Sequence, residues 1–544
     1  MKKIISLILA TIMVLSMVAC GGPTNDPKPT EPKDPVTNYV PSYPIVEEKI
    51  TLTGIIVNRY PNKEGNHERV LWDRVEEVTN IKVNWINLES VDALNTYLAG
   101  NEWPDLIHYT LDKATVNDYG VIGGRFVNWI EYLDIMPNLK KALEDYPAAA
   151  AKMTLLNGEA YGLPNMSGPS ATGVSCRPYV RLDVLENAGI TELPTTVEEF
   201  YQCLKTLKAY YNAPGLIMDK STTSNWSPML FAAFGTFNQI GFDDDGTGTV
   251  VHTYTSNQMK EYYKYMNKLF SEGLLHNEWQ TLDGLAKNGP IHKVDSTIAF
   301  MSANSAQNLK ADHLKDGNWD YLTCLAPLTS SFDSTQTLTG VMTVGGGNMY
   351  VNAGSEYVEE IMKMLDIAYA TEEVVEGSGL YGQAFGYGPE GTGWWWNEDG
   401  TYSQSNGEEY GYDSYTALQQ YELIHLSVGR TDAWGMNATT EIGNARSRQL
   451  GFMENVIPYQ QTGNFFLLSN LTFTDDEQMI LDQYLTEINK YTTEMYAGFI
   501  NGIYDVDAEW NNYCKKLKDM GIDEVLEVYQ AAYDRWNAAI DALG

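Results

Sequence analysis

The sequence is poor in basic residues. Its 544 residues include 36 lysines and arginines against 71 aspartates and glutamates, so the formal net charge is −35 at pH 7. A phosphate backbone or an anionic membrane surface repels so acidic a chain overall. We therefore predict no nucleic-acid partner, and the simplest interpretation of the charge is that it keeps a secreted protein soluble.

Histidine and cysteine are also scarce, with seven and five residues. Beyond Cys20 the cysteines are widely spaced and form no Cys-x-x-Cys pair, which indicates neither a metal site nor a disulfide framework. Three successive aspartates at 243–245 lack the ligand alternation and the distal glutamate of a calcium loop, so they favour a turn. We predict no metal and no cofactor. The sequence leaves open whether the four remaining cysteines are free or paired: Cys176, Cys203, Cys324 and Cys514.

The common catalytic motifs are missing. The chain has no Gly-x-Ser-x-Gly, no His-Glu-x-x-His and no P-loop. Carboxylates are abundant, however, and a glycosidase pair about 5–9 Å apart is compatible with the sequence. The sequence thus favours a protein that is not an enzyme.

The apolar run at the N-terminus is too short for a membrane span. Residues 4–18 follow two lysines and precede Ala19-Cys20-Gly21, the pattern of a secretory signal. A transmembrane helix is the alternative, but it needs about 20 apolar residues. Cysteine directly after the cleavage point resembles a bacterial lipobox, which implies that residues 1–19 are removed and that Cys20 becomes the lipidated N-terminus. Residues 20–46 are rich in Pro, Thr, Asp and Lys, which predicts a disordered tether.

Aromatic residues, in contrast, are plentiful. They make up 12% of the chain, with 13 Trp and 36 Tyr. Flat rings with polar tips suit sugar recognition, because they stack on the C–H faces of pyranoses while their N–H and O–H groups find partners. Core packing remains the commoner explanation for any single aromatic side chain.

The first folded segment has the pattern of a βαβ unit. Residues 49–58 alternate like a strand, residues 67–79 carry apolar side chains at helical spacing, and residues 81–86 return to a strand. Such units build parallel sheets, whose ligands bind beyond the carboxyl ends of the strands. Arg59, directly after the first strand, is therefore a candidate binding residue.

Residues 157–208 contain clear signals for where turns and helices begin and end. Asn157-Gly158 is a turn signal, Asp183 lies where a helix should be capped, and Gly189 lies where that helix should end. Thr195 and Thr196, followed by Glu198 and Glu199, predict a capping box for the next helix.

This stretch carries a family resemblance. Asn-Gly-x-x-Tyr-Gly-x-Pro at 157–164, Arg-x-Asp-x-Leu at 181–185 and Pro-x-Thr-x-Glu-Glu at 194–199 resemble, in this order and spacing, the family 1 extracellular solute-binding proteins, receptors of carbohydrate ABC importers. The resemblance implies an α/β fold of the periplasmic-binding-protein type II, with two lobes joined by hinge crossings. Each lobe is expected to hold a mainly parallel sheet flanked by helices, and the C-terminal portion is expected to be helical. The expected lobes are residues 47–163 with 327–375, and residues 164–326 with 376–544.

The resemblance also suggests ligand-facing residues. In maltodextrin receptors an aromatic residue and an acid lie just past a Pro-Asp-(Ile/Leu) strand, and Tyr109 and Asp112 occupy the matching positions here. Trp226 lies in a Trp-Ser-Pro segment similar to one that supplies a stacking ring. Asn304 follows a strand similar to one that precedes a ligand-facing loop. The calcium-holding loop of many long relatives is absent at 210–215, so we expect no such site.

A glycine-rich segment adds three consecutive tryptophans. Residues 381–396, followed by Asp399-Gly400, resemble a segment of the longer oligosaccharide-binding lipoproteins, in which Glu390 and an adjacent Trp would clamp one sugar ring. Alternate side chains of an extended run point to opposite sides, so at most two of the three rings contact a ligand. We choose Trp394 first and Trp396 second.

The sequence as a whole predicts a receptor. We expect a monomeric, lipid-anchored protein on the extracellular face of the membrane that closes on an oligosaccharide and delivers it to an ABC permease. The alternatives are a surface carbohydrate hydrolase, an adhesin that works without a transporter, and a receptor for another cargo such as a peptide or a polyamine.

Overall fold

The computed structural model describes residues 39–57, 70–167, 178–218, 227–236, 239–243, 247–282, 296–302, 314–339, 343–392, 394–398, 402–404, 408, 429–431, 451, 454–461, 468 and 471–543. Every helix and strand given below belongs to one compact unit, Val40–Gly544.

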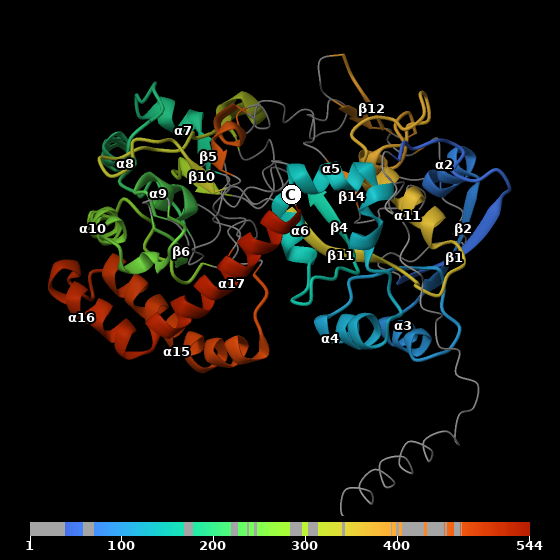
Figure 1. Ribbon diagram of the computed structural model, residues 1–544. Coiled ribbons are helices and arrows are strands. Elements are labelled where there is room, and N and C mark those ends of the chain that lie inside the picture. The colour runs from blue at the N-terminus through green and yellow to red at the C-terminus, as the bar shows by residue number, and fades with distance from the viewer. Residues whose placement is uncertain are drawn as a thin grey trace, which may run out of the picture. The chain divides into compact units, whose positions relative to one another are not determined.

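A six-stranded sheet organises the first part of the chain (Figure 1). Its strand order is β14-β4-β11-β3-β1-β2. β11 is antiparallel to both of its neighbours, while β1 is parallel to β2 and β3, and β14 is parallel to β4. Five strands therefore share one direction and β11 alone is reversed. The bounds are β1 Ile50–Val57, β2 Ile81–Leu88, β3 Leu106–His108, β4 Leu163–Ser167, β11 Thr343–Val351 and β14 Gly429–Thr431.

Helices pack against this sheet through apolar stripes. In α2 (Val70–Thr79), Leu71, Trp72 and Val75 are buried, and the Trp72 ring lies 4.9 Å from that of Trp85 in β2. The other helices of this region are α3 Val91–Leu98, α4 Lys113–Val116, the π-helix η1 Asn117–Ile122, η2 Trp129–Ile135, α5 Pro137–Asp145, α6 Pro147–Met153, α11 Val358–Asp366, η9 Ile367–Tyr369 and α12 Gly382–Tyr387.

A second, three-stranded sheet has its own set of helices. Its order is β8-β5-β9, with β5 antiparallel to both neighbours. Both pairings of this sheet are antiparallel, so the mainly parallel sheet that we expected in the second lobe is not found among the described strands. The strands are β5 Pro178–Arg181, β8 Phe300–Ser302 and β9 Leu322–Cys324, and the nearby helices are α7 Leu182–Asn187, α8 Val197–Tyr211, α9 Ser227–Ala233 and α10 Asn257–Ser271.

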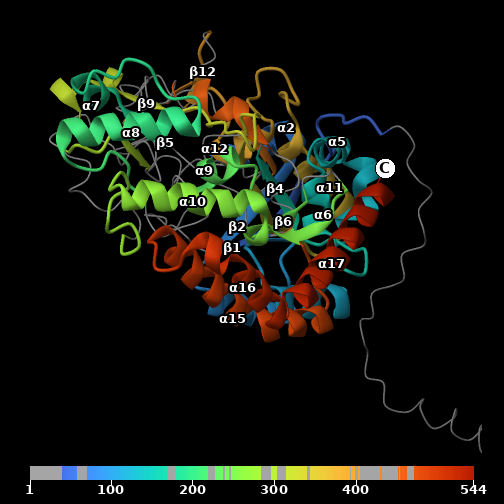
Figure 2. The ribbon, with the colours of Figure 1, turned by 90° about the vertical axis from the view of Figure 1, so that its left-hand side faces the viewer.

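The long helices α8 and α10 run with their axes roughly aligned (Figure 2). α8 begins with the predicted capping box, in which Thr196 and Glu199 satisfy each other's backbone N–H groups. The Tyr265 hydroxyl of α10 donates to the Val197 carbonyl at 2.8 Å and ties the two helices together.

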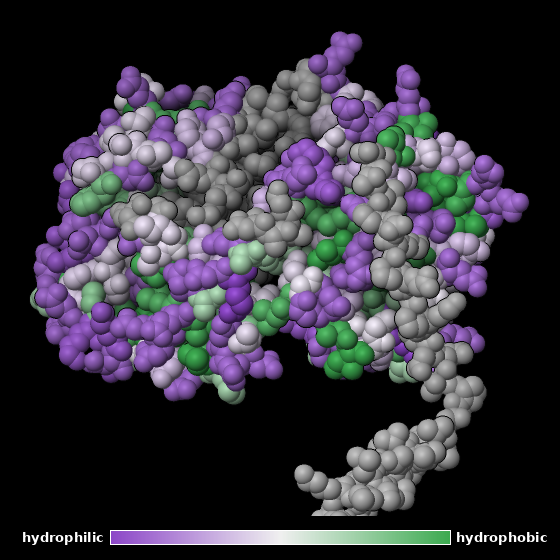
Figure 3. Space-filling model, viewed as in Figure 1, coloured by the Kyte–Doolittle hydropathy of each residue, from purple (hydrophilic) through white to green (hydrophobic). Residues whose placement is uncertain are grey.

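The C-terminal part is helical: α15 Asp475–Ile500, α16 Val506–Asp519 and α17 Ile522–Leu543. Thr474 and Glu477 form a capping box at the start of α15. Arg535 of α17 donates to both carboxylate oxygens of Glu477, at 2.7 and 2.6 Å, and so joins α17 to the start of α15. Hydrophilic residues dominate the surface over α16 on the face shown in Figure 3, as expected for a solvated amphipathic helix.

Short elements complete the described chain. They are β6 Ile240–Phe242, β7 Val250–His252, β10 Leu338–Thr339, β12 Trp394–Trp396, β13 Tyr402–Gln404, β15 Gln460–Gln461, and the 3-10 turns η3 Thr253–Thr255, η7 Lys315–Gly317, η8 Trp319–Tyr321 and η12 Ile457–Tyr459.

The pairing of β14 bears on the proposed lobes. We expected residues 376–544 in the second lobe, whereas residues 429–431 pair with β4 in the six-stranded sheet. Strand β4 also continues to Ser167, past the proposed boundary at 163. The chain thus returns to the first sheet once more than we proposed, and the bounds of the lobes remain a prediction.

A buried histidine in β7 gives a stability prediction. The His252 ring is 4% exposed, neither ring nitrogen has a hydrogen-bond partner in the described part of the chain, and burial lowers its pKa to about 4. The unfolded state therefore binds more protons between pH 6.5 and 4, and stability is lost as the pH falls through that window. A depression of this size corresponds to about 3 kcal/mol.

Unfolding by urea at pH 7 and pH 4.5 measures the effect. His252→Leu should lose less stability between the two pH values than the native protein does. An equal loss in both proteins would show that His252 does not set the acid sensitivity.

Candidate functional site

The carboxyl ends of the parallel strands define one candidate edge. Tyr109 directly follows β3, is half-buried, and its backbone N–H donates to the carbonyl of Asn348 at 2.8 Å. The Thr110 hydroxyl also hydrogen-bonds the Asn348 side-chain carbonyl. Ligands of open parallel sheets bind at this kind of edge. The structure therefore places Tyr109 where the sequence predicted it, beside a strand end.

Asn348 is a residue that the sequence reasoning missed. It lies in a register shift of β11 between Gly345 and Met349, where the pairing with β4 is irregular. Bulges of this kind often re-aim a side chain next to a binding site. Three consecutive glycines at 345–347 were the available signal, because glycine inside a strand often marks a bulge.

Asp112 has a structural role as well as a candidate role in ligand binding. It is exposed and caps α4, accepting the Thr115 backbone N–H at 2.8 Å. This bond holds the pKa of Asp112 below its ordinary value. The carboxylate is thus ionised at neutral pH and is held beside the end of β3, where it can accept hydrogen bonds from hydroxyl groups.

An aromatic cluster packs beside this edge, in contact with Tyr109. The Phe126 ring lies 5.5 Å from Trp103, 6.4 Å from Tyr161 and 5.0 Å from Tyr350. Tyr161, the tyrosine of the Asn-Gly-x-x-Tyr motif, is 6% exposed and donates its hydroxyl proton to Glu159 at 2.7 Å. The motif therefore serves packing here, and it fixes the segment that enters β4.

The three consecutive tryptophans form strand β12 of a hairpin with β13, drawn near the top of Figure 1. Trp394 is 2% exposed and donates its indole N–H to the Gly388 carbonyl at 2.9 Å. Trp395 is 42% and Trp396 is 36% exposed. Trp394 and Trp396 lie on one face, 5.7 Å apart and nearly perpendicular. Burial of Trp394 favours Trp396, our second choice, as the ligand-facing ring.

Glu390 and Trp396 meet through a third residue. The Tyr381 hydroxyl donates to Glu390 Oε2 at 3.0 Å, and it accepts the indole N–H of Trp396 at 3.2 Å. Tyr381 immediately precedes α12, which packs against β14 and so ties this group to the six-stranded sheet. The structure thus links Glu390 and Trp396 through Tyr381, and the role of these side chains in sugar binding stays a prediction.

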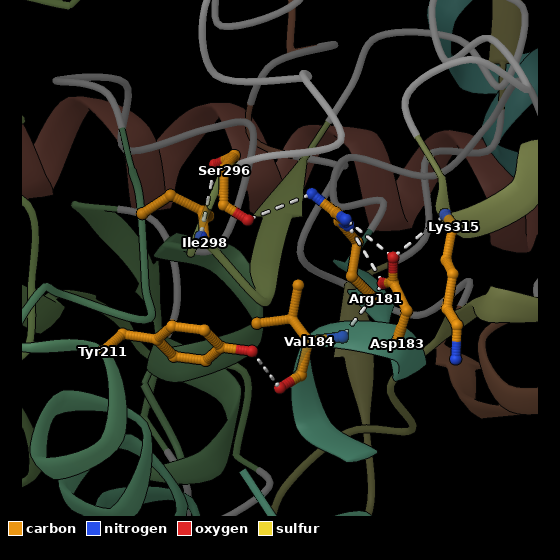
Figure 4. Close-up of polar contacts among 7 residues, drawn as sticks. All are labelled: Arg181, Asp183, Val184, Tyr211, Ser296, Ile298 and Lys315. Atoms are coloured by element: carbon orange, nitrogen blue, oxygen red, sulfur yellow. Dashed lines mark hydrogen bonds and ion pairs between the residues drawn. The ribbon is translucent and has the colours of Figure 1, made fainter. Parts of the chain in front are cut away.

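A buried ion pair lies beside the second sheet (Figure 4). Arg181 and Asp183 are 2% and 3% exposed and joined by two hydrogen bonds of 3.1 and 2.7 Å. Arg181 also donates to the Ser296 carbonyl at 3.2 Å, and Asp183 accepts the Lys315 backbone N–H at 3.1 Å. We expected Asp183 as a helix cap, but α7 begins at Leu182, and the carboxylate instead neutralises Arg181. The pair therefore holds together chain segments on both sides of β8.

Other predicted residues fall outside the described part of the chain: Cys20, Arg59, Trp226, Asn304 and Cys176. Within it, Cys203, Cys324 and Cys514 form no disulfide bond. The described residues contain no group of three or more His, Cys, Asp or Glu that could hold a metal ion. No helix among them is long and apolar enough to cross a membrane.

One known protein resembles the chain along nearly its whole length, and another resembles part of it. It is 24% identical to "Fructooligosaccharide ABC transporter substrate-binding protein FusA" of Streptococcus pneumoniae serotype 4, with 98% of each chain covered. It is 23% identical to "Lipoprotein LipO" of Bacillus subtilis over 56% of this chain and 61% of that protein. Residues 470–538 match a family described as "Domain of unknown function (DUF3502)".

A solved structure shows the same fold. The model matches "HMO binding ABC-transporter associated Solute Binding Protein" of Bifidobacterium longum infantis with a TM-score of 0.61 and 17% identity, over 89% of this chain and 99% of that one. The predicted fold class, a two-lobed α/β fold of the solute-binding type with a helical C-terminal part, is thereby confirmed. The chain is thus similar over nearly its whole length to a substrate-binding protein of an ABC transporter, the kind of receptor that its motifs resemble.

Proposed function

We propose that the chain is a lipid-anchored extracellular receptor that binds an oligosaccharide and delivers it to an ABC importer. The observation that carries the proposal is its similarity, over 98% of both chains, to a fructooligosaccharide ABC transporter substrate-binding protein. Sequence identity of 24% leaves the sugar open, so we propose the class of ligand and no particular glycan.

The proposed binding mechanism is closure of two lobes. The two largest sheets among the described strands belong to the two proposed lobes, and the chain passes from β4 in the first to β5 in the second and returns through β11. A ligand that contacts both lobes stabilises the closed state by the contacts that it makes only there. The permease then distinguishes the loaded closed receptor from the empty open one.

Two groups of side chains are the proposed sugar contacts in the described residues. Asp112 and Tyr109 would pair a carboxylate with a ring at the end of β3. Glu390 and Trp396 would do the same at the β12 hairpin. A carboxylate accepts hydroxyl protons while the ring covers a C–H face, which is the usual division of roles in a sugar subsite.

The anchor and the partners belong to the proposal as well. The N-terminal signal pattern and similarity to a protein named as a lipoprotein support lipidation of Cys20. We further propose that the mature protein is a monomer, that it is not an enzyme, and that it meets the permease at the outer face of the membrane.

A thermal-shift screen tests the proposed function. The protein from Gly21 onward is melted with kestose, maltotriose, mannotriose and trigalacturonic acid, and with tripeptides as controls. A ligand at one hundred times its Kd adds about 2.7 kcal/mol of stability and raises the melting temperature visibly. We expect a selective shift with at least one neutral sugar, which is recovered intact. A shift with peptides alone would refute the sugar cargo, and a sugar that is cleaved would indicate a hydrolase.

A further inference from the structure

We propose that Tyr381 is the positioning residue of the subsite formed by Glu390 and Trp396. It holds these two side chains in an arrangement that binds a neutral sugar ring. The inference deepens the proposed function and rests on it. Tyr381 contacts both candidate ligand groups through a single oxygen atom, which donates to Glu390 and accepts from Trp396.

The Trp396 indole is held on two sides. Its N–H is engaged by Tyr381 at 3.2 Å, and its ring packs edge-to-face on the buried Trp394 at 5.7 Å and 84°. Trp396 is nevertheless 36% exposed. An indole whose N–H is occupied offers a ligand mainly its π-face, so the ring acts as a stacking platform. Fixing such a ring before binding reduces the entropy lost when the ligand arrives.

The Glu390 carboxylate is also held in place. Its Oε2 accepts from Tyr381 at 3.0 Å, and Oε1 has no hydrogen-bond partner in the described part of the chain. The Glu390 backbone N–H donates to the Gly379 carbonyl at 3.3 Å. Glu373 in turn accepts the backbone N–H groups of Gly377 and Gly379, at 2.7 and 2.9 Å. One carboxylate oxygen is therefore available to a ligand, on a loop held by these backbone hydrogen bonds.

Glycine is required at one point of this loop. Gly379 has a φ of +66°, and a Cβ there would lie 2.6 Å from the Glu390 carbonyl oxygen. Only a residue without a side chain allows the two segments to approach so closely.

Tyr381 keeps its proton over the whole physiological range. Burial is the main cause that raises the pKa of Tyr381 well above its ordinary value, and the charge of Glu390 adds to it. The hydroxyl therefore always donates to Glu390 and always presents a lone pair to Trp396. The geometry of the subsite should not vary between pH 6 and pH 9.

The positions of Trp396 and Glu390 determine which class of sugar this subsite can bind. A ring with an exposed C–H face and an adjacent hydroxyl group can stack on Trp396 while it donates to Glu390 Oε1. A uronic or sialic acid carboxylate at the same place would face Glu390 within a chain of net charge −35. The subsite should therefore discriminate against anionic sugars.

The first test needs no ligand. The protein labelled with ¹⁵N-tryptophan gives a signal for each of its 13 indoles, and Trp396→Phe identifies that of Trp396. Tyr381→Phe keeps the ring and removes only the hydroxyl, so the Trp396 signal should move upfield and exchange faster with solvent. Tyr504→Phe is the matched control, because it removes a Tyr–Glu hydrogen bond of 3.3 Å to Glu494 in the C-terminal helices. An unchanged Trp396 signal in Tyr381→Phe would overturn the proposal.

The second test measures affinity for the four sugars of the thermal-shift panel. Tyr381→Phe should weaken binding of the best neutral sugar about three- to tenfold at an unchanged melting temperature of the free protein, but less than twofold in a Trp396→Ala background. The native protein should prefer neutral sugars to trigalacturonic acid. Equal loss in both backgrounds would assign Tyr381 a role independent of Trp396. If no sugar binds the native protein, the proposed function fails, while the indole measurement still decides the role of Tyr381.

Discussion

Trp396→Ala should weaken oligosaccharide binding by about thirtyfold or more. Removing an aromatic anchor at the centre of a binding site costs about 2 kcal/mol or more, and each 1.4 kcal/mol is about a tenfold change in affinity. The Trp396 ring is 36% exposed on a hairpin, so its removal should leave the melting temperature almost unchanged. Isothermal titration calorimetry with the best sugar of the panel measures the loss.

The two neighbouring tryptophans are internal controls. Trp395 is 42% exposed and points to the other side of β12, so Trp395→Ala should alter neither affinity nor stability appreciably. Trp394 is 2% exposed, and Trp394→Ala should cost about 3–5 kcal/mol of folding free energy. Loss of affinity on replacing Trp395, with none on replacing Trp396, would reverse the assignment of the ligand-facing side.

Breaking the Arg181–Asp183 pair should destabilise the protein by about 3–5 kcal/mol, because it leaves an uncompensated buried charge. Both side chains lie almost wholly out of solvent, and together they also hold the segments at Ser296 and Lys315. Arg181→Ala and Asp183→Ala are each compared with the native protein by urea unfolding.

The double variant tests whether the loss of stability comes from the charge that each single variant leaves unpaired. When both charges are removed, the loss should be smaller than the sum of the two single losses, since no lone charge remains buried. Lys515→Ala is a matched control, because its ion pair with Asp519 is largely exposed and should matter little. Single variants as stable as the native protein would show that the site admits water and that the charges are not truly buried.

Local signals in the sequence predicted the elements well. The strands expected at 49–58 and 81–86 are β1 at Ile50–Val57 and β2 at Ile81–Leu88. The expected capping box forms at Thr196. These features depend on residues within a few positions of one another, so a single segment contains all the information needed.

Long-range features could not be predicted in the same way. Alternation along β12 indicates that Trp394 and Trp396 share a face, but it does not say which of them the rest of the fold covers. The pairing of β14 with β4 joins residues more than 260 positions apart in sequence, and no local pattern specifies it. Tyr381 was missed for the same reason, because its partners lie 9 and 15 residues away, beyond helix α12.

The most direct test of the proposed receptor is calorimetric titration of the protein from Gly21 onward with the neutral oligosaccharides, followed by chromatography of the recovered ligand. The proposed function predicts saturable binding of one sugar molecule per chain, weakened about thirtyfold or more in Trp396→Ala, with the sugar recovered unchanged. Absence of binding to every sugar tested, or recovery of shortened products, would contradict it.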